Sequence, residues 1–318
     1  MNYQNIVYPY QKLISPFDIE ILNEELKKLK INIITKLPNK LKQQNIKVDK
    51  YNKKYKIICE NYMKNLPINS LTDYFTEKQR IQCSFGNKKS PLETWNNQKT
   101  NIIAKCYKKY KKVNIHLLRE TILDFTKPCN NFRITVVLAL LKIFKPKRVL
   151  DGSAGWGDRL LGAILSQHVN YYESCDPNID LHSGYDEIKE IFVKKSKMNY
   201  VIHPTGFLEC NLGERTFDCV LTSPPFFTLE KYSTHDNDSI TKFNNNKDWV
   251  HKFIVPMMEK FQKHLIIGGH LLLYIHDYDP ILNDALKKVN SKMKFLGSIY
   301  FYDTVPRKIQ VWKKIKNN

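Results

Sequence analysis

The spacing of apolar residues changes about 125 residues into the chain. Before that point, apolar positions recur mostly at helical spacing, as in Phe17–Leu29. Ser15 and Pro16 precede that segment in the positions of a helix N-cap and a first helical residue. After that point, short apolar runs alternate with amphipathic stretches. The pattern predicts a mostly helical region over 1–125 and an α/β region over 126–318.

The second region contains a series of short, β-rich apolar runs. Helical stretches such as Arg159–Leu165 separate several of them, and this alternation predicts a mainly parallel sheet. The last two runs lie on either side of a turn at Pro306 and predict a closing β-hairpin. Gly268 and Gly269 separate two further runs. The predicted strands are Lys147–Leu150, Asn170–Ser174, Tyr200–Ile202, Phe217–Leu221, His264–Ile267, His270–Ile275, Phe295–Tyr302 and Lys308–Lys313.

The charge is strongly positive and unevenly distributed. The 318 residues carry 51 Lys+Arg and 31 Asp+Glu, a formal net charge of +20. Residues 1–120 hold 24 basic and 10 acidic side chains, and residues 121–318 hold 27 and 21, so the net charges are +14 and +6. A codon bias toward lysine would spread the charge more evenly. The asymmetry favours an N-terminal region that faces a polyanion such as nucleic acid.

Two stretches interleave lysine with tyrosine, Lys50–Lys56 and Lys105–Lys112. Such a pattern suits a surface that holds phosphates and stacks bases. It equally suits a solvated lysine face with the tyrosines packed inward. Both interpretations stay open for each stretch.

Other sequence features limit the classes of protein to which this chain could belong. No run approaches the ~18 apolar residues of a membrane span, and the N-terminus has no secretory pattern. The seven cysteines are scattered and form no CxxC motif, which argues against a disulfide framework and a zinc site. We therefore expect an intracellular enzyme without a structural metal.

A glycine-rich loop follows the first predicted strand of the α/β region. It reads Asp-Gly-Ser-Ala-Gly-Trp-Gly from Asp151, and small residues at Ser153, Gly155 and Gly157 allow a sharp turn close to a ligand. The G-x-G-x-x-G register of dinucleotide-binding folds is absent, and no Gly-Lys-Ser/Thr of a P-loop follows. A second acid, Asp176, ends the next predicted strand. Its carboxylate could accept both hydroxyls of a ribose.

The sequence Ser223-Pro224-Pro225-Phe226 directly follows another predicted strand. Two adjacent prolines impose a rigid extended turn. An aromatic amine is a poor nucleophile because its lone pair is delocalised into the ring. The Ser223 hydroxyl and the Pro224 carbonyl could accept the two N–H hydrogens of such an amine. This would direct the lone pair at a methyl donor. Phe226 would stack on the ring of the nucleic-acid base that carries the amine.

Together, Asp151–Gly157, Asp176 and Ser223–Phe226 resemble the class I amino-methyltransferase family with its (D/N/S)PP(Y/F) motif. The resemblance covers residues 126–318. It implies S-adenosyl-L-methionine as cofactor, with Asp151 and the loop at the methionine moiety, Asp176 at the ribose, and Ser223–Phe226 at the target amine.

The resemblance also suggests less secure assignments. Arg133 would hold the cofactor's carboxylate, although a solvated helix-start arginine fits as well. Phe207 and Glu209 would lie near the adenine ring of the cofactor. Tyr232 would line the site of the target base or lie on the surface.

The resulting hypothesis is a methyltransferase that modifies adenine N6 or cytosine N4 in DNA. RNA is the alternative polymer, with adenosine N6 or guanosine N2 as the target. An inactive methyltransferase fold that binds nucleic acid as a subunit is the alternative of another class. The α/β region is too short for a dedicated recognition domain, so target recognition falls to the N-terminal region, a protein partner or the polar loop Thr234–Lys247. The oligomeric state stays open.

Overall fold

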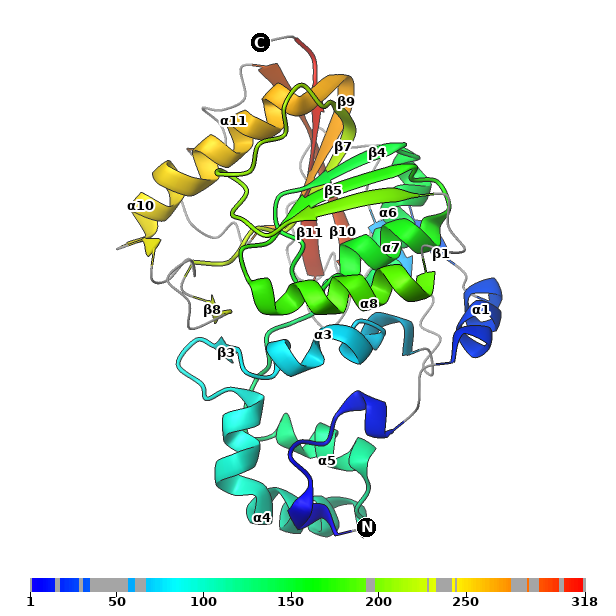
Figure 1. Cartoon of the computed structure of the whole chain (residues 1–318), viewed down its shortest axis with the longest axis vertical. Coiled ribbons are helices and arrows are strands. Elements are labelled where there is room, and N and C mark those ends of the chain that lie inside the picture. The colour runs from blue at the N-terminus through cyan, green and yellow to red at the C-terminus, as the bar shows by residue number, and fades with distance from the viewer. Residues whose placement is uncertain are drawn as a thin grey trace.

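The computed structural model places an α/β layer above a helical lobe (Figure 1). The structure describes residues 2–14, 18–28, 31–34, 57–60, 67–192, 198–227, 229–232, 242–243, 245–275, 285, 292–302 and 306–316. Most of the loop Thr234–Lys247 and the stretch Lys50–Lys56 lie outside the described residues. Ser15 and Pro16 also lie outside them.

Strands and α-helices alternate from β4 to β6. The described α-helices are α1 Ile19–Lys28, α3 Asp73–Arg80, α4 Pro91–Tyr110, α5 Ile115–Ile122, α6 Ile134–Phe144, α7 Asp158–Ser166, α8 His182–Phe192, α10 Asn246–Trp249 and α11 Val255–His264. The described strands are β1 Ile31–Ile34, β2 Ile57–Glu60, β3 Ser84–Phe85, β4 Arg148–Asp151, β5 Tyr171–Cys175, β6 Asn199–His203, β7 Phe217–Thr222, β8 Glu230–Lys231, β9 Leu265–Leu273, β10 Met293–Tyr302 and β11 Pro306–Lys314.

The main sheet has the strand order β1-β2-β10-β11-β9-β7-β4-β5-β6. Strands β6, β5, β4, β7 and β9 run parallel, and the antiparallel hairpin β10–β11 closes the sheet beside β9. The chain enters the parallel part at β4 and later crosses to β7 on its other side, so the strand order reverses between them. The predicted fold class is confirmed: an α/β, Rossmann-like sheet with a closing hairpin and a mostly helical N-terminal region.

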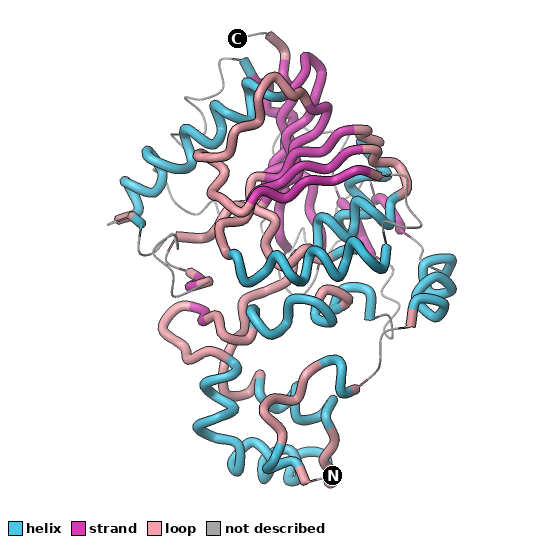
Figure 2. The backbone as a smooth tube through the Cα atoms, viewed as in Figure 1, coloured by secondary structure: helices cyan, strands magenta, loops and turns pink. Residues whose placement is uncertain are grey.

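Helices cover both faces of the sheet, as Figure 2 shows. Alternate residues of each strand point to opposite faces, because the side-chain period of a strand is two. On β7, Cys219 and Leu221 join the core beneath α6, α7 and α8, whereas Val220 joins the core beneath α11. On β9, Leu272 joins the core beneath α6, α7 and α8, and Leu273 joins the core beneath α11. Two apolar layers therefore fix the sheet and the edge at which its parallel strands end.

Two features of the sheet differ from the expected pattern. The N-terminal strands β1 and β2 extend it, with β2 parallel to β10 through the pairs Ile57–Tyr300 and Ile58–Phe301. The Gly268–Gly269 pair does not end a strand, because β9 continues through it. Between the pairs Phe217–Leu265 and Cys219–His270 the register shifts, so the glycines lie in a bulge. Gly268 has a φ of 85°, which suits glycine.

The helical lobe contains α4, α5 and the N-terminal segment around a separate apolar cluster that includes Tyr8, Trp95 and Leu118. Helix α3 lies between this lobe and the sheet, and its Tyr74 belongs to the main core together with Leu71. The boundary between 1–125 and 126–318 stays a prediction, and the main core draws side chains from both regions.

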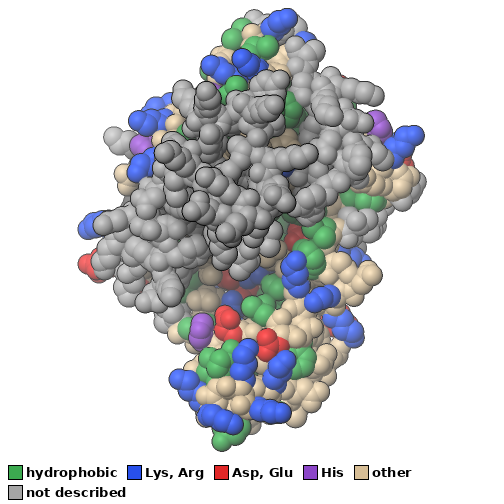
Figure 3. All heavy atoms as spheres, turned by 180° about the vertical axis from the view of Figure 1, so that it is seen from behind, with side chains coloured by type: hydrophobic (Ala, Val, Ile, Leu, Met, Phe, Trp, Pro, Cys, Tyr) green, Lys and Arg blue, Asp and Glu red, His purple; other side chains and the backbone are tan. Residues whose placement is uncertain are grey.

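The lysine–tyrosine stretch Lys105–Lys112 ends α4 and begins the turn to α5. Lys105 and Lys109 both approach the Asp124 carboxylate, at 3.4 and 3.3 Å. Tyr107 is 60% exposed, so the tyrosines are not all packed inward. Figure 3, which views the molecule from behind, shows Lys and Arg side chains distributed over this lobe.

Candidate active site

The three sequence motifs meet at one edge of the sheet. Asp151 ends β4, Asp176 follows β5, and Ser223 follows β7. These strands are neighbours and parallel, so their carboxyl ends lie side by side. In an open α/β sheet this edge, at the reversal of strand order, is where ligands bind. The fold thus brings the glycine-rich loop, the second acid and the Ser-Pro-Pro-Phe segment together.

The Asp151 carboxylate is buried and saturated by protein donors. One oxygen accepts hydrogen bonds from Arg159 Nε (2.6 Å) and the Tyr172 hydroxyl (2.7 Å). The other accepts from the Thr222 hydroxyl (2.8 Å) and the Ser153 N–H (3.2 Å). Asp151 therefore shapes the loop from beneath. Arg159, Tyr172 and Thr222 were not predicted from the sequence, although Thr222 directly precedes the Ser-Pro-Pro-Phe motif.

The glycine-rich loop has a defined shape. Gly155 and Gly157 have φ values of 58° and 86°, in the region that favours glycine. The Ser153 hydroxyl donates to the Ser223 carbonyl at 2.8 Å. Arg159, already paired with Asp151, also donates to the Ser153 carbonyl. One hydrogen bond therefore joins the predicted cofactor loop directly to the predicted catalytic segment.

Asp176 lies against the same loop. Its carboxylate oxygens accept the N–H groups of Gly155 (2.7 Å) and Asn178 (3.0 Å). A carboxylate has about four lone-pair sites, so both oxygens retain acceptor capacity. Burial raises the pKa of Asp176 to about 6, opposed by those two backbone hydrogen bonds. The loop on one side and the following turn on the other therefore fix the orientation of the Asp176 carboxylate.

The Ser-Pro-Pro-Phe segment is rigid and partly accessible. Pro224 is buried, whereas Ser223, Pro225 and Phe226 are half-buried. Among the described residues, the Ser223 hydroxyl and the Pro224 carbonyl have no hydrogen-bond partner. The Phe226 ring meets Tyr274 edge to face, with ring centroids 5.9 Å apart.

Tyr232 supports this segment. Its hydroxyl donates to Glu230 and accepts a hydrogen bond from the Phe226 N–H. Its ring lies 6.2 Å from that of Trp156 in the cofactor loop. Tyr232 is half-buried, and it links the loop to the chain that follows the motif.

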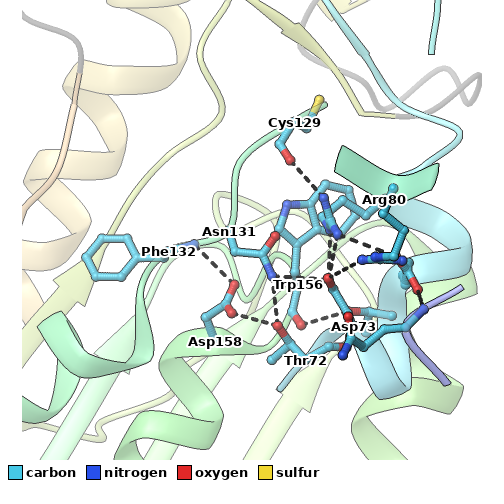
Figure 4. A network of polar contacts seen from close by, with 12 residues as sticks. Thr72, Asp73, Arg80, Cys129, Asn131, Phe132, Trp156 and Asp158 are labelled. Atoms are coloured by element: carbon cyan, nitrogen blue, oxygen red, sulfur yellow. Dashed lines mark hydrogen bonds and ion pairs between the residues drawn. The ribbon is translucent and has the colours of Figure 1, made fainter. Parts of the chain in front are cut away.

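A buried polar network joins helix α3 to the cofactor loop (Figure 4). The Thr72 hydroxyl donates to Asp158, the first residue of α7, at 2.7 Å, and it accepts from the Asn131 amide at 3.0 Å. The other Asp158 oxygen accepts the Phe132 N–H at 3.2 Å. Burial raises the pKa of Asp158 to about 7, against the Thr72 hydrogen bond and the Arg159 charge. The Thr76 hydroxyl donates to the Trp156 carbonyl at 2.9 Å.

The network continues through α3 into the helical lobe. Arg80 donates two hydrogen bonds to Asp73, at 2.6 and 3.0 Å, and a third to the Cys129 carbonyl at 3.4 Å. Arg119 of α5 pairs with Asp73 at 3.3 Å and with Glu77. Burial and the neighbouring Asp73 raise the pKa of Glu77. The lobe is therefore tied to the candidate site by buried charges as well as by apolar packing.

The remaining predicted site residues, Arg133, Phe207 and Glu209, lie outside the three motifs. Arg133 is the half-buried N-cap residue of α6. Phe207 is 2% exposed, and its ring lies 4.6 Å from that of Phe261. A Cβ atom on Gly152 would come within 3.4 Å of the Phe207 ring, so this ring lies beneath the loop. Glu209 is exposed and pairs with Lys242 at 2.7 Å.

No cluster of three or more His, Cys, Asp or Glu in the described part of the chain could hold a metal ion. Six cysteines are free and buried: Cys83, Cys106, Cys129, Cys175, Cys210 and Cys219. None of the described helices is long and apolar enough to cross a membrane.

Comparisons with known proteins give similar structures and no family. No model of a known family matches the sequence, and no curated protein matches it. The structure is similar to TrmN from Thermus thermophilus, with 16% identity and a TM-score of 0.43. That match covers 58% of this chain and 49% of TrmN, so the chain spans about half of TrmN's length.

Two further solved structures are similar over most of their own length. A methyltransferase from Pyrococcus furiosus has 15% identity and a TM-score of 0.44, over 70% of this chain and 100% of that one. An rRNA methylase from Streptococcus thermophilus has 12% identity and a TM-score of 0.39, over 57% and 96%.

Proposed function

We propose that this chain is an S-adenosyl-L-methionine-dependent methyltransferase that acts on an exocyclic amino group of a nucleic-acid base. The observation that carries the proposal is the hydrogen bond from the Ser153 hydroxyl to the Ser223 carbonyl. It holds the loop predicted to bind the methyl donor against the segment predicted to hold the acceptor. Transfer of a methyl group requires this proximity, because donor and acceptor must approach in line.

The cofactor would lie along the carboxyl ends of β4 and β5. Its ribose hydroxyls would donate to Asp176, and its methionine moiety would follow the backbone of Ser153–Gly157. S-adenosyl-L-methionine supplies an electrophilic methyl group on a sulfonium. Asp151 would act on it only through the loop, because protein donors occupy its carboxylate.

The target amine would lie at Ser223 and Pro224. Its two N–H groups would donate to the Ser223 hydroxyl and the Pro224 carbonyl, which have no other partner among the described residues. These acceptors favour a pyramidal nitrogen whose lone pair points at the methyl group, so the chemistry needs positioning and no strong base. Phe226 would stack on the base after its extrusion from a helix or loop.

DNA is the favoured polymer, with adenine N6 or cytosine N4 as the acceptor. The net charge of +20 supports a nucleic acid of either kind. RNA is therefore the second candidate, with adenosine N6 or guanosine N2 as the acceptor. An inactive methyltransferase fold that binds nucleic acid as a subunit is the alternative of another class, and its function would not need the cofactor.

The test is incubation of the purified chain with tritiated S-adenosyl-L-methionine and separate DNA and RNA pools. The products are digested to nucleosides, and the labelled nucleoside is identified. Label in N6-methyladenine or N4-methylcytosine from DNA is the expected result. Label in RNA alone would move the substrate to the second candidate. No label in either pool, despite cofactor binding, would refute the proposal.

A further inference from the structure

A two-stranded ribbon lies directly beside the candidate active site. β3, Ser84–Phe85, pairs antiparallel with β8, Glu230–Lys231. The Gly86 N–H donates to the Leu229 carbonyl at 2.7 Å, and the Leu229 N–H donates to the Phe226 carbonyl at 3.2 Å. Two successive backbone hydrogen bonds therefore connect the N-terminal region to the last residue of the Ser-Pro-Pro-Phe motif.

The ribbon ends in an exposed turn. The Lys88 N–H donates to the Phe85 carbonyl at 3.1 Å, which closes a turn through Gly86. Gly86 has a φ of 56°, and a Cβ atom there would meet no atom within 4 Å. The turn therefore projects away from neighbouring atoms. Lys88 is exposed at its end.

The exposed charge of the ribbon is positive. Lys88, Lys127 and Lys231 are exposed and have no acidic partner among the described residues. The Lys127 ammonium lies 3.5 Å from the centre of the Phe85 ring, which places it over β3. Glu230, the acid of β8, is 4% exposed. We call the side chains of Lys88, Lys127 and Lys231 the ribbon surface.

Resting on the proposed function, we propose that the ribbon surface binds the sugar–phosphate backbone that flanks the target base. An enzyme that modifies an amine of a base must take that base out of its stack. The backbone on either side of it must then be held close to the reacting group. The three lysines, which have no acidic partner in the described part of the chain, would supply that attraction through phosphate contact and counterion release.

The other lysine-rich surface suits this role less well. At the end of α4, Lys105 and Lys109 share Asp124, so part of their charge is neutralised. Helix α4 has 20 residues and begins at Pro91, next to the ribbon turn. The helix is kinked at Gln98, and beyond the kink it continues to the end of the lobe that lies away from β3 (Figure 1). Exposed lysines near the far end of α4 and on α6 therefore serve as controls.

The experiment compares two variants with the same change in charge. The ribbon variant carries Lys88→Gln, Lys127→Gln and Lys231→Gln. The control variant carries three substitutions of lysines that are exposed and lack an acidic partner among the described residues: Lys108→Gln, Lys112→Gln and Lys142→Gln. Fluorescence anisotropy measures the affinity of each for labelled 20-nucleotide DNA and RNA strands of one sequence at several salt concentrations. Thermal unfolding checks that both variants are folded.

We expect the ribbon variant to bind at least about tenfold more weakly at 50 mM salt, with a salt-dependence slope smaller by about 2, since each contact with a single strand contributes about 0.7. KM for the nucleic acid should rise, while kcat and the Kd for S-adenosyl-L-methionine stay unchanged. The control variant should change binding less than about threefold, because its lysines would contact no phosphate.

Equal weakening in the two variants, or none in the ribbon variant, would overturn the ribbon proposal. The wild-type chain separates this outcome from failure of the proposed function. If it methylates nucleic acid but the variants behave alike, only the ribbon proposal is wrong. If it methylates neither polymer yet the ribbon variant alone loses binding, the surface stands and the catalytic proposal is wrong.

Discussion

Replacement of Asp151 by asparagine should destabilise the protein strongly. Asp151 is fully buried, and its carboxylate is paired with Arg159 at 2.6 Å. Asparagine keeps one oxygen for Thr222 and Ser153, but it removes the charge and directs an amide N–H₂ at donors of Arg159 and Tyr172. Removal of one partner of a buried ion pair costs about 3–5 kcal/mol, because the other charge is left unpaired. We expect a loss of that size in the free energy of unfolding.

Urea unfolding followed by tryptophan fluorescence measures this loss. Asp218→Asn is the matched control, since Asp218 is half-buried and accepts only the backbone N–H groups of Lys147 and Arg148 among the described residues. It should lose about 1 kcal/mol. In a double-mutant cycle with Arg159→Met, the two sites should couple. An Asp151→Asn loss no larger than that of the control would refute the conclusion that Asp151 acts by holding the loop.

Three further outcomes are expected. Ser223→Ala should lower kcat for methyl transfer by about 10–100-fold, because one acceptor for the target amine is lost. The Kd of S-adenosyl-L-methionine should change little. An unchanged kcat would exclude Ser223 as an amine acceptor. Cofactor affinity, measured by calorimetry between pH 5 and 8, should fall below about pH 6 as Asp176 is protonated. In Asp176→Asn the affinity should be weak throughout and independent of pH, and a retained pH dependence would assign it to another group. Thr72→Val should lower the free energy of unfolding in urea by about 1–3 kcal/mol. The loss should be larger at pH 8 than at pH 6, because the pKa of Asp158 is about 7 and its ionised form needs the hydrogen bond from the Thr72 hydroxyl. Equal losses at the two pH values would contradict this.

The parallel strands could be predicted because each is marked by a local signal. The run ending in Asp151 and the run ending in Thr222 are short, apolar and followed by turn residues, and the structure places both within one residue of the predicted bounds. β1 and β2 are also short and mostly apolar, but they lie in the region where apolar residues recur mostly at helical spacing, and they were not predicted as strands. Each has four residues, and β2 joins the sheet through a pairing between Ile57 and Tyr300 that local spacing does not encode.

The outline of the candidate site could also be predicted, whereas the function of its individual atoms could not. Spacing and strand ends place Asp151, Asp176 and Ser223 at one edge of the sheet. Spacing does not reveal that Asp151 is saturated by Arg159, because this depends on side chains from β4, β5, β7 and α7. The burial of Phe207 beneath Gly152 depends on the packing of α11.

The strand order also has a consequence for synthesis of the protein. β2 contacts the main sheet only through β10 among the described strands, and the paired residues Ile57 and Tyr300 lie at opposite ends of the chain. A ribosome makes the N-terminal region first, so β1 and β2 have no place in the sheet until the closing hairpin emerges. Such non-local pairing is slow, and unpaired strands are prone to aggregation. The sheet would therefore be complete only after β10 has been made.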